Sequence, residues 1–427
     1  MSLSHPHPAQ ARWLSQLALD LEQRRTTHTY RSLTEVAGAQ GPTLRIANQE
    51  FIQFCTNNYL GLASDPIVVD AARAALDRYG MGASASRLVA GSMELHHRLE
   101  EELARFKGVP AALVLSTGFM ANLAALTTFA GSADRIISDK LNHASLLDAA
   151  RFSGAEHRTF PHRDYARAQA LLQRPPRAHR ATGVAPGESP GLEGPSARAS
   201  QTFLVTDSVF SMDGDLADLP TLCAAARRQE ALVVIDEAHA TGVLGQRGRG
   251  LAEAQGVEED IALTIGTLSK AIGSVGGFIC GPQPAIEMLI NAGRAFIYTT
   301  ALPPACSAAA LAALQIIQSS EGQVRRQRVL ALADHVRREL TLLGFDCGSS
   351  QTPIVPVLLG SSQSALQAAA FLRERGLWVP AIRPPTVPPN QARLRLSLMA
   401  THRDADIERL VEAFRELRRV MGVYGLG

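Results

Sequence analysis

The feature that most constrains the fold is a series of short apolar runs that alternate with helical stretches from about residue 51 onward. Most of them are rich in Val, Ile and Leu and are followed by turn residues, which is typical of buried strands in an α/β protein. The runs are AALVL (111–115), RIISD (135–139), TFLVTD (202–207), ALVVID (231–236), ALTIGT (262–267) and GGFIC (276–280). They predict a mostly parallel sheet that is covered by helices on both faces.

The regions outside these runs indicate further parts of the chain. Residues 11–25 are predicted to form an amphipathic helix, and a helix–strand–helix–strand pattern after about residue 318 predicts a smaller α+β domain with strands at 353–359 and 393–398. The expected parts are an N-terminal segment (1–50), a large domain (51–317) and a small C-terminal domain (318–427). A stretch rich in Pro, Gly and Ser (174–200) predicts a mobile surface insertion with no catalytic role.

The composition limits which binding partners and which cellular location can be expected. A net charge of +2 gives no electrostatic reason to expect nucleic acid or an anionic membrane. The five cysteines are odd in number and never form a CxxC pair, so neither a disulfide framework nor a metal site is indicated. Since no apolar leader and no run approaching the ~20 residues of a membrane span is present, we expect a cytoplasmic protein.

Lysine is scarce, so few side chains could serve as a nucleophilic amine. The chain has only Lys107, Lys140 and Lys270. Lys270 lies in GTLSKAIGSVGG, where a predicted strand runs into a glycine-rich turn, and an amine in such a constricted polar pocket can form a Schiff base. A solvated surface lysine is the alternative, but the small neighbours and the scarcity of lysine favour a functional role for Lys270.

Two further polar side chains follow the strand 231–236. A carboxylate at Asp236 could keep a pyridine nitrogen protonated, and His239 could hydrogen-bond the phenolic oxygen of the same cofactor. Taken singly, Asp236 could be a helix N-cap and His239 a loop histidine. Together with Lys270 they favour pyridoxal phosphate as cofactor.

The residues after strands 111–115 and 135–139 suit other parts of such a cofactor. Residues 116–119 (STGF) open a helical stretch, so free backbone N–H groups there would attract a phosphate, although an ordinary capped helix has the same geometry. Thr267 could add a hydroxyl to that phosphate. His143, in KLNHAS, could stack on an aromatic ring or have only a structural role.

Two arginines near the C-terminus are candidates for binding a carboxylate. Arg383 lies in the proline-stiffened AIRPPTVPP and Arg395 in the alternating ARLRLSL, where a fixed guanidinium can hold a carboxylate through two hydrogen bonds.

Two other motifs suggest different chemistry and can be excluded. DEAH (236–239) also occurs in nucleotide hydrolases, but that chemistry needs GxxxxGK[ST], and none of the three lysines is preceded by Gly. GMGASA (80–85) matches a dinucleotide fingerprint, but the segment before it is predicted to be helical rather than a strand.

Taken together, the motifs resemble those of the α-oxoamine synthases, a pyridoxal-phosphate family with the aspartate-aminotransferase fold (fold type I). The similarity runs from about residue 15 to the C-terminus. The motifs are TNNYLGL, STGFMAN, LNHASLLDAA, DSVFSMDGD, IDEAHATG, GTLSKAIGS, IYTTALPP and AIRPPTVPPNQARLRLSL. The chain departs from the family pattern at GMGASASRLVAG (80–91), where Ala83 and Ala85 stand in the usual glycine-rich loop, and at the insertion.

The resemblance implies a role for each candidate residue. The catalytic residues would be Lys270, which carries the cofactor, Asp236 at the pyridine nitrogen, His143 stacked on the ring, and His239, which with Ser211 bonds the phenolic oxygen. The phosphate contacts would be Gly118, Phe119 and Thr267, with Thr300 contributed by a partner subunit. The substrate contacts would be Asn57 and Arg395 for the amino-acid carboxylate, and Arg31 and Arg383 near the acyl chain.

The resemblance also implies a reaction and an assembly. The last motif is most similar to those members that join L-alanine to a pimeloyl thioester, with loss of carbon dioxide, in biotin biosynthesis; the acyl carrier could be coenzyme A or an acyl-carrier protein. The family is homodimeric, with active sites at the subunit interface. The alternatives are a sister enzyme that uses glycine or serine, an aminotransferase, and a protein without catalytic activity.

Overall fold

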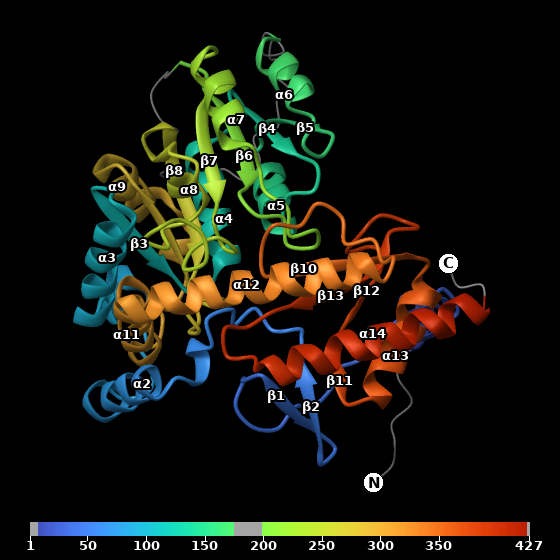
Figure 1. The fold of residues 1–427 in the computed structure, drawn as a ribbon. Coiled ribbons are helices and arrows are strands. Elements are labelled where there is room, and N and C mark those ends of the chain that lie inside the picture. Colours follow the sequence, from blue (N-terminus) through green and yellow to red (C-terminus); the bar gives the residue numbers. More distant parts are fainter. Residues whose placement is uncertain (1–6, 175–198, 425–427) are drawn as a thin grey trace.

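A seven-stranded sheet forms the centre of the larger part of the molecule, within the residues that the computed structural model describes, 7–174 and 199–424 (Figure 1). The strand order is β3-β9-β8-β7-β6-β4-β5. The bounds are β3 (Ala111–Leu115), β4 (Arg135–Asp139), β5 (Glu156–Phe160), β6 (Thr202–Asp207), β7 (Leu232–Asp236), β8 (Ile261–Thr267) and β9 (Gly277–Gly281). Strand β9 pairs antiparallel with β8 and β3, and the other pairs are parallel. The predicted mostly parallel sheet is therefore confirmed.

The six strands predicted from apolar runs are all present, and their ends differ from the prediction by at most one residue. Strand β5 (EHRTF) was missed. It lies at the edge of the sheet, and of its residues only Phe160 is buried, so its sequence lacks the apolar run that marks the inner strands.

Successive residues of the inner strands face opposite layers of helices. In β4, Ile136 packs into one apolar cluster and Ile137 into the other, and Leu204 and Val205 of β6 divide in the same way. The helices of one layer are α4 (Gly118–Phe129), α5 (Ala144–Phe152), α9 (Gln283–Ala292) and α10 (Arg294–Ile297). The helices of the other are α3 (Glu94–Lys107), α6 (Tyr165–Leu172), α7 (Leu219–Arg227), α8 (Leu251–Ala254) and α11 (Pro304–Gln318). Since both faces are covered, polar side chains of the inner strands gather at the strand ends.

The C-terminal part forms a smaller α+β unit (Figure 1). Its antiparallel sheet has the order β10-β13-β12, with β10 (Ile354–Gly360), β12 (Ala381–Ile382) and β13 (Ala392–Ser397). The helices packed around it are α12 (Ser320–Leu342), α13 (Ser362–Glu374) and α14 (Asp404–Tyr424). The expected fold class is thus confirmed, whereas the domain limits at residues 50 and 317 remain a prediction.

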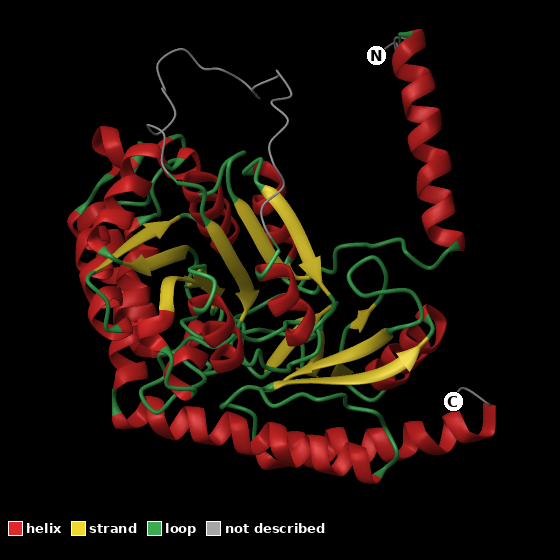
Figure 2. Ribbon diagram, turned by 90° about the horizontal axis from the view of Figure 1, so that it is seen from above, coloured by secondary structure: helices red, strands yellow, loops and turns green. Residues whose placement is uncertain are grey.

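The N-terminal region connects with this smaller unit. Strands β1 (Thr43–Ile46) and β2 (Gln49–Gln53) form a hairpin, and β11 (Leu377–Trp378) pairs parallel with β2. Before them, α1 (Pro8–Thr26) confirms the predicted N-terminal helix, but it has no buried residue and extends away from the rest of the chain (Figure 2). In the described residues, no helix is long and apolar enough to cross a bilayer.

Helix α2 (Pro66–Tyr79) precedes the glycine-rich residues 80–85, as predicted, which removes the strand that a dinucleotide fingerprint needs. The remaining short helical segments are η1 (Leu62–Ser64), η2 (Arg87–Gly91) and η3 (Glu258–Asp260). Most of the predicted surface insertion at 174–200 lies outside the described residues.

Candidate active site

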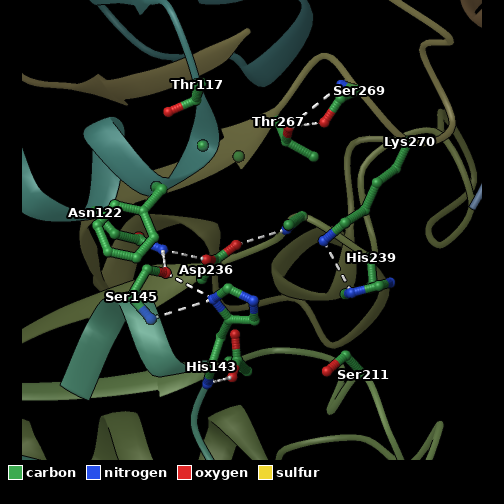
Figure 3. Close-up of a pocket in the computed structure, with 15 residues that line it drawn as sticks. Thr117, Asn122, His143, Ser145, Ser211, Asp236, His239, Thr267, Ser269 and Lys270 are labelled. Carbon is green, nitrogen blue, oxygen red and sulfur yellow. Dashed lines mark hydrogen bonds between the residues drawn. The ribbon is translucent and has the colours of Figure 1, made fainter. Parts of the chain in front are cut away.

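A cavity of about 240 Å³ lies where the carboxyl ends of β4, β6, β7 and β8 meet the start of α4 (Figure 3). This is the edge at which open α/β sheets bind their ligands. The cavity is lined by Thr117, Gly118, Phe119, Asn122, His143, Ser145, Asp207, Ser211, Asp236, Ala238, His239, Gly266, Thr267, Ser269 and Lys270. All of the predicted catalytic residues, and every predicted cofactor contact except Thr300, therefore border one space.

The Lys270 amine is held by His239. Lys270 Nζ lies 2.8 Å from His239 Nε2, and the other ring nitrogen, Nδ1, lies 2.7 Å from the Tyr59 hydroxyl. Burial lowers the pKa of Lys270 to about 8, although the charges of Asp236 and Asp207 oppose the shift. The pKa of His239 falls well below its usual value, first through burial and then through the Lys270 charge. A neutral imidazole therefore faces an amine that loses its proton easily.

Asp236 also places a carboxylate in the wall of the cavity. Its Oδ2 accepts a hydrogen bond from Asn122 Nδ2 (2.7 Å) and its Oδ1 accepts one from the backbone N–H of Ala238 (2.8 Å). Among the described residues, no Lys, Arg or His side chain forms an ion pair with Asp236, although only 6% of the residue is exposed. Because burying an unpaired charge is costly, this carboxylate suits a cationic group of a ligand.

Asp207 ends the neighbouring strand β6, directly beside Asp236 in the sheet register. Its carboxylate accepts the backbone N–H of His143 at 2.5 Å. Burial and, after it, the charge of Asp236 raise the pKa of Asp207 well above its usual value. A proton on Asp207 would relieve the repulsion between the two carboxylates.

His143 is fixed at the start of α5. Its Nδ1 lies 2.7 Å from Ser145 Oγ, and Asn122 Nδ2 donates to the same hydroxyl at 2.8 Å. Burial is the main cause that lowers the pKa of His143, so the ring is neutral near pH 7. The predicted stacking of His143 on a cofactor ring remains a prediction, but the contact with Ser145 holds the ring at the cavity wall.

The start of α4 forms an anion cradle. Thr117 Oγ1 caps the helix by accepting the N–H of Met120 (3.1 Å), while the N–H groups of Gly118 and Phe119 donate to no acceptor within the described residues. A Cβ added at Gly118 would lie 3.3 Å from the Thr267 side chain, so the backbone approaches Thr267 closely. Two free N–H groups at a helix N-terminus favour a phosphate.

Asn57 and Arg395, predicted to bind a carboxylate, lie together next to this cavity. Arg395 Nη2 donates to Asn57 Oδ1 (3.2 Å), Nη1 donates to Ser397 Oγ (2.8 Å), and Nε donates to the carbonyl oxygen of Ser211. The guanidinium is therefore oriented by three groups before any substrate binds.

The other predicted residues lie elsewhere in this chain. Arg31 and Arg383 line a second hollow of about 610 Å³, where Arg31 Nη2 donates to Thr386 Oγ1 (2.9 Å) and Arg383 Nη2 donates to the Tyr30 carbonyl (3.4 Å). Thr300 is exposed outside the cavity of its own chain, and its carbonyl accepts a hydrogen bond from Ser116 Oγ (2.9 Å). Its predicted contact, with the cofactor phosphate in a second subunit, requires a dimer and remains a prediction.

Three residues that shape the site were not predicted from the sequence. They are Tyr59, Asn122 and Ser145. A signal was available for each, because they lie within motifs already recognised (TNNYLGL, STGFMAN and LNHASLLDAA). Asp207 ends a predicted strand at the edge where a ligand is expected, but no role was predicted for it from the sequence.

Comparison with known proteins agrees with this arrangement. The family model for class I and II aminotransferases matches residues 49–414, and the chain therefore belongs to this family. Within it, the chain groups with the 8-amino-7-oxononanoate synthases. It is 44% identical to the one from Geobacter sulfurreducens over 407 residues (95% of this chain, 99% of that protein) and 45% identical to the one from Stutzerimonas stutzeri over 406 residues (95% and 97%).

Solved structures show the same fold. Serine palmitoyltransferase from Sphingomonas wittichii is 31% identical, with a TM-score of 0.83 and coverage of 99% of both chains. The 8-amino-7-oxononanoate synthase from Francisella tularensis is 28% identical, with a TM-score of 0.71 and coverage of 87% of this chain and 98% of that chain. The resemblance inferred from the motifs is confirmed.

The cavity fits pyridoxal phosphate on its own evidence. It offers a buried carboxylate without a cationic partner (Asp236), unused N–H donors at a helix start (Gly118 and Phe119) and an amine with a lowered pKa (Lys270). The buried Oδ1 of Asn122 also has no hydrogen-bond partner within the described residues. These groups match the pyridinium nitrogen, the phosphate and the aldehyde of that cofactor, and an unmet buried acceptor is rare in a completed site.

Proposed function

We propose that this chain condenses L-alanine with a pimeloyl thioester to give 8-amino-7-oxononanoate and carbon dioxide, a step of biotin biosynthesis, with pyridoxal phosphate as cofactor. The observation that carries the proposal is the convergence of Lys270, Asp236, His143 and His239 on one cavity. The names of relatives that are 44–45% identical over 95% of the chain support the choice of reaction.

The protein would hold the cofactor through groups already described. Lys270 would bind it covalently, Asp236 would pair with its ring nitrogen, and the start of α4 with Thr267 would hold its phosphate. When bound, the cofactor supplies an electron-withdrawing ring that stabilises negative charge on the α-carbon of the amino acid.

The chain's own residues would handle the substrate and its protons. Arg395 and Asn57 would bind the alanine carboxylate, which fixes the α-carbon relative to Lys270. The freed Lys270 amine would then remove the α-proton as general base, since a pKa of about 8 leaves a useful fraction of the amine neutral near pH 7. Arg31 and Arg383 would lie near the acyl chain.

The proposal includes an assembly and a location. A homodimer would allow Thr300 of one subunit to approach the phosphate site of the other, because Thr300 is exposed in its own chain. The five cysteines are all free, which is consistent with a cytoplasmic location.

Labelled substrate tests the reaction. Alanine labelled at the carboxyl carbon, given with pimeloyl-coenzyme A or with a pimeloyl-acyl-carrier protein, should release labelled carbon dioxide and show which carrier is used. Borohydride reduction and peptide mapping should place the cofactor on Lys270 and not on the exposed Lys140. The Lys270→Ala variant should show neither result. No release from cofactor-loaded enzyme with either donor would refute the proposed reaction.

The second candidate is a sister enzyme that uses glycine or serine with another acyl thioester. It is favoured by the serine palmitoyltransferase structures, which are 30–31% identical to this chain. A panel of alanine, glycine and serine against several acyl donors would separate the two, because the true pair should have the highest kcat/KM.

A further inference from the structure

A continuous hydrogen-bonded chain leads from the Lys270 amine to the proposed carboxylate site. Lys270 Nζ contacts His239 Nε2 (2.8 Å), His239 Nδ1 contacts the Tyr59 hydroxyl (2.7 Å), and that hydroxyl donates to Asn57 Oδ1 (3.2 Å). Tyr59 and His239 are 1% and 6% exposed, so bulk water does not replace these partners. In such a series, the donor at one hydrogen bond determines which group must donate at the next.

The direction of each hydrogen bond follows from the guanidinium of Arg395, which can only donate. Arg395 Nη2 can only donate, so Asn57 presents its oxygen to both Arg395 and Tyr59. The Tyr59 hydroxyl has one hydrogen, and when it donates this to Asn57 its oxygen can only accept from His239. Nδ1 of His239 then carries the proton, and Nε2 presents a lone pair to Lys270.

The opposite arrangement is poorer by one hydrogen bond. If Tyr59 donated to Nδ1, its bond to Asn57 would be lost, and Nε2–H would point at the Lys270 nitrogen. Nε2–H would then occupy the lone pair that a general base needs. A neutral amine has two N–H groups, so it can donate one to Nε2 and keep its lone pair free for the substrate.

We infer that Tyr59 is a positioning residue, which, held by Asn57, keeps His239 in the Nδ1–H form so that the Lys270 lone pair stays free to take the substrate proton. This role rests on the proposed function and deepens it. It also connects the base to the carboxylate site, because Asn57 is shared by Tyr59 and Arg395.

The groups that act on Lys270 come from several elements. Besides His239 and Tyr59 they are Asp236 at the end of β7, Asp207 at the end of β6, Arg395 on β13 and His143 before α5. Of these four groups only Arg395 also contacts the Tyr59 hydroxyl. A change at Lys270 in a Tyr59→Phe variant therefore reports on the hydrogen bonds of that hydroxyl.

Removing the Tyr59 hydroxyl should move the proton of the His239 ring from Nδ1 to Nε2. In Tyr59→Phe, Nδ1–H would be a buried donor without an acceptor, whereas an unused lone pair on Nδ1 is tolerated better. His239 should therefore shift its proton to Nε2 and donate to Lys270, which disfavours the charged amine. The loss of a hydrogen bond to a charged group predicts that the pKa of Lys270 falls by about one unit.

The experiment uses the cofactor-free chain and two readouts. The pKa of Lys270 is measured by NMR on protein labelled with [ε-13C]lysine, where three lysines give three signals and Lys270→Arg identifies the one of interest. Neutron diffraction of the parent protein locates the proton on His239. We expect Nδ1–H in the parent and a Lys270 pKa lower in Tyr59→Phe.

Tyr165→Phe is the matched control. It also removes a partly buried tyrosine hydroxyl, which accepts a hydrogen bond from the backbone N–H of Asp218 (2.9 Å), and neither residue lines the cavity. The control should leave the Lys270 pKa unchanged. An Nε2–H proton in the parent, an unchanged pKa in Tyr59→Phe, or an equal shift in Tyr165→Phe would each overturn the inference.

Failure here is distinct from failure of the proposed function. Both readouts are made without cofactor or substrate, so an unchanged pKa in Tyr59→Phe with normal carbon dioxide release refutes only the role of Tyr59. No carbon dioxide release from the cofactor-loaded parent enzyme, together with a shifted Lys270 pKa in Tyr59→Phe, would instead refute the reaction and leave the role of Tyr59 in place.

Discussion

At the scale of single residues, one imidazole joins the end of β4 to the loop that follows β6. His162 Nδ1 lies 3.1 Å from Asp139 Oδ2, and its Nε2 lies 2.9 Å from Asp215 Oδ2. Asp139 precedes His143 by four residues, and Asp215 follows Ser211 by four. Burial alone would lower the pKa of His162, but the hydrogen bonds and charges of the two carboxylates raise it to about 9.

His162→Gln should therefore destabilise the protein in a pH-dependent way. Because the folded-state pKa is raised from 6.5 to about 9, the stabilisation is complete below about pH 6.5 and is lost as the pH rises through about 9. A rise in pKa from 6.5 to about 9 corresponds to about 3 kcal/mol. Thermal unfolding of parent and variant should show a large difference in Tm at pH 6 and a much smaller one at pH 9.5.

His157→Gln is the control for this prediction. His157 lies on β5 with its Nε2 2.8 Å from Ser138 Oγ, and burial lowers its pKa, so it has no charge to lose at alkaline pH. Its Tm difference should not shrink between pH 6 and 9.5. An equal gap for His162→Gln at both pH values would show that the two carboxylates do not hold a proton on His162.

At the scale of elements, β8 and β9 approach each other closely just before the lysine. Gly266 and Phe278 are register partners, and a Cβ at position 266 would lie 2.2 Å from Cζ of the Phe278 ring. That ring is fully buried, so it has little room to move. The glycine thus lets β8 lie close enough to β9 to place Thr267 and Lys270 at the cavity.

Gly266→Ala should weaken both stability and cofactor binding. Overpacking of this kind costs about 1–3 kcal/mol, and relief by movement of β8 would displace Thr267 and Lys270. Urea unfolding measures the first effect, and a pyridoxal-phosphate titration followed by absorbance measures the second. Gly41→Ala, where no atom lies within 4 Å of the added Cβ, should match the parent. Parent-like cofactor affinity in Gly266→Ala would contradict the positional role of this contact.

The sequence predicted elements well where burial on both faces forced an apolar run. This holds for β3, β4 and β6, whose ends match the runs from which they were predicted. Strand β5 was missed because an edge strand with one buried residue carries no such run. The order of the strands, and the pairing of β2 with the distant β11, depend on packing that no local pattern encodes.

At the scale of the whole molecule, the site is assembled from segments that lie between Asn57 and Arg395 in the sequence. Residue types and motifs identified most of its members, because Schiff-base chemistry needs a lysine and the chain has three. Hydrogen-bond partners such as Tyr59 and Asn122 could not be assigned, since their roles depend on distances that only the folded chain defines. The role predicted for Thr300 depends on a contact with a second subunit, which the fold of one chain does not define.

Paired lesions in the two subunits can test whether the active sites are shared. Thr300→Glu would set a carboxylate against the proposed phosphate site, and like charges should prevent cofactor binding there. The side chain is exposed in its own chain, so the variant should fold.

Thr300→Glu and Lys270→Ala homodimers should both lose activity. In a heterodimer purified through two different tags, a partner's Thr300 would leave one site with both lesions and the other site intact, so about half of the parent activity should return. If Thr300 instead served its own subunit, each site of the heterodimer would carry one lesion and the activity would stay near zero.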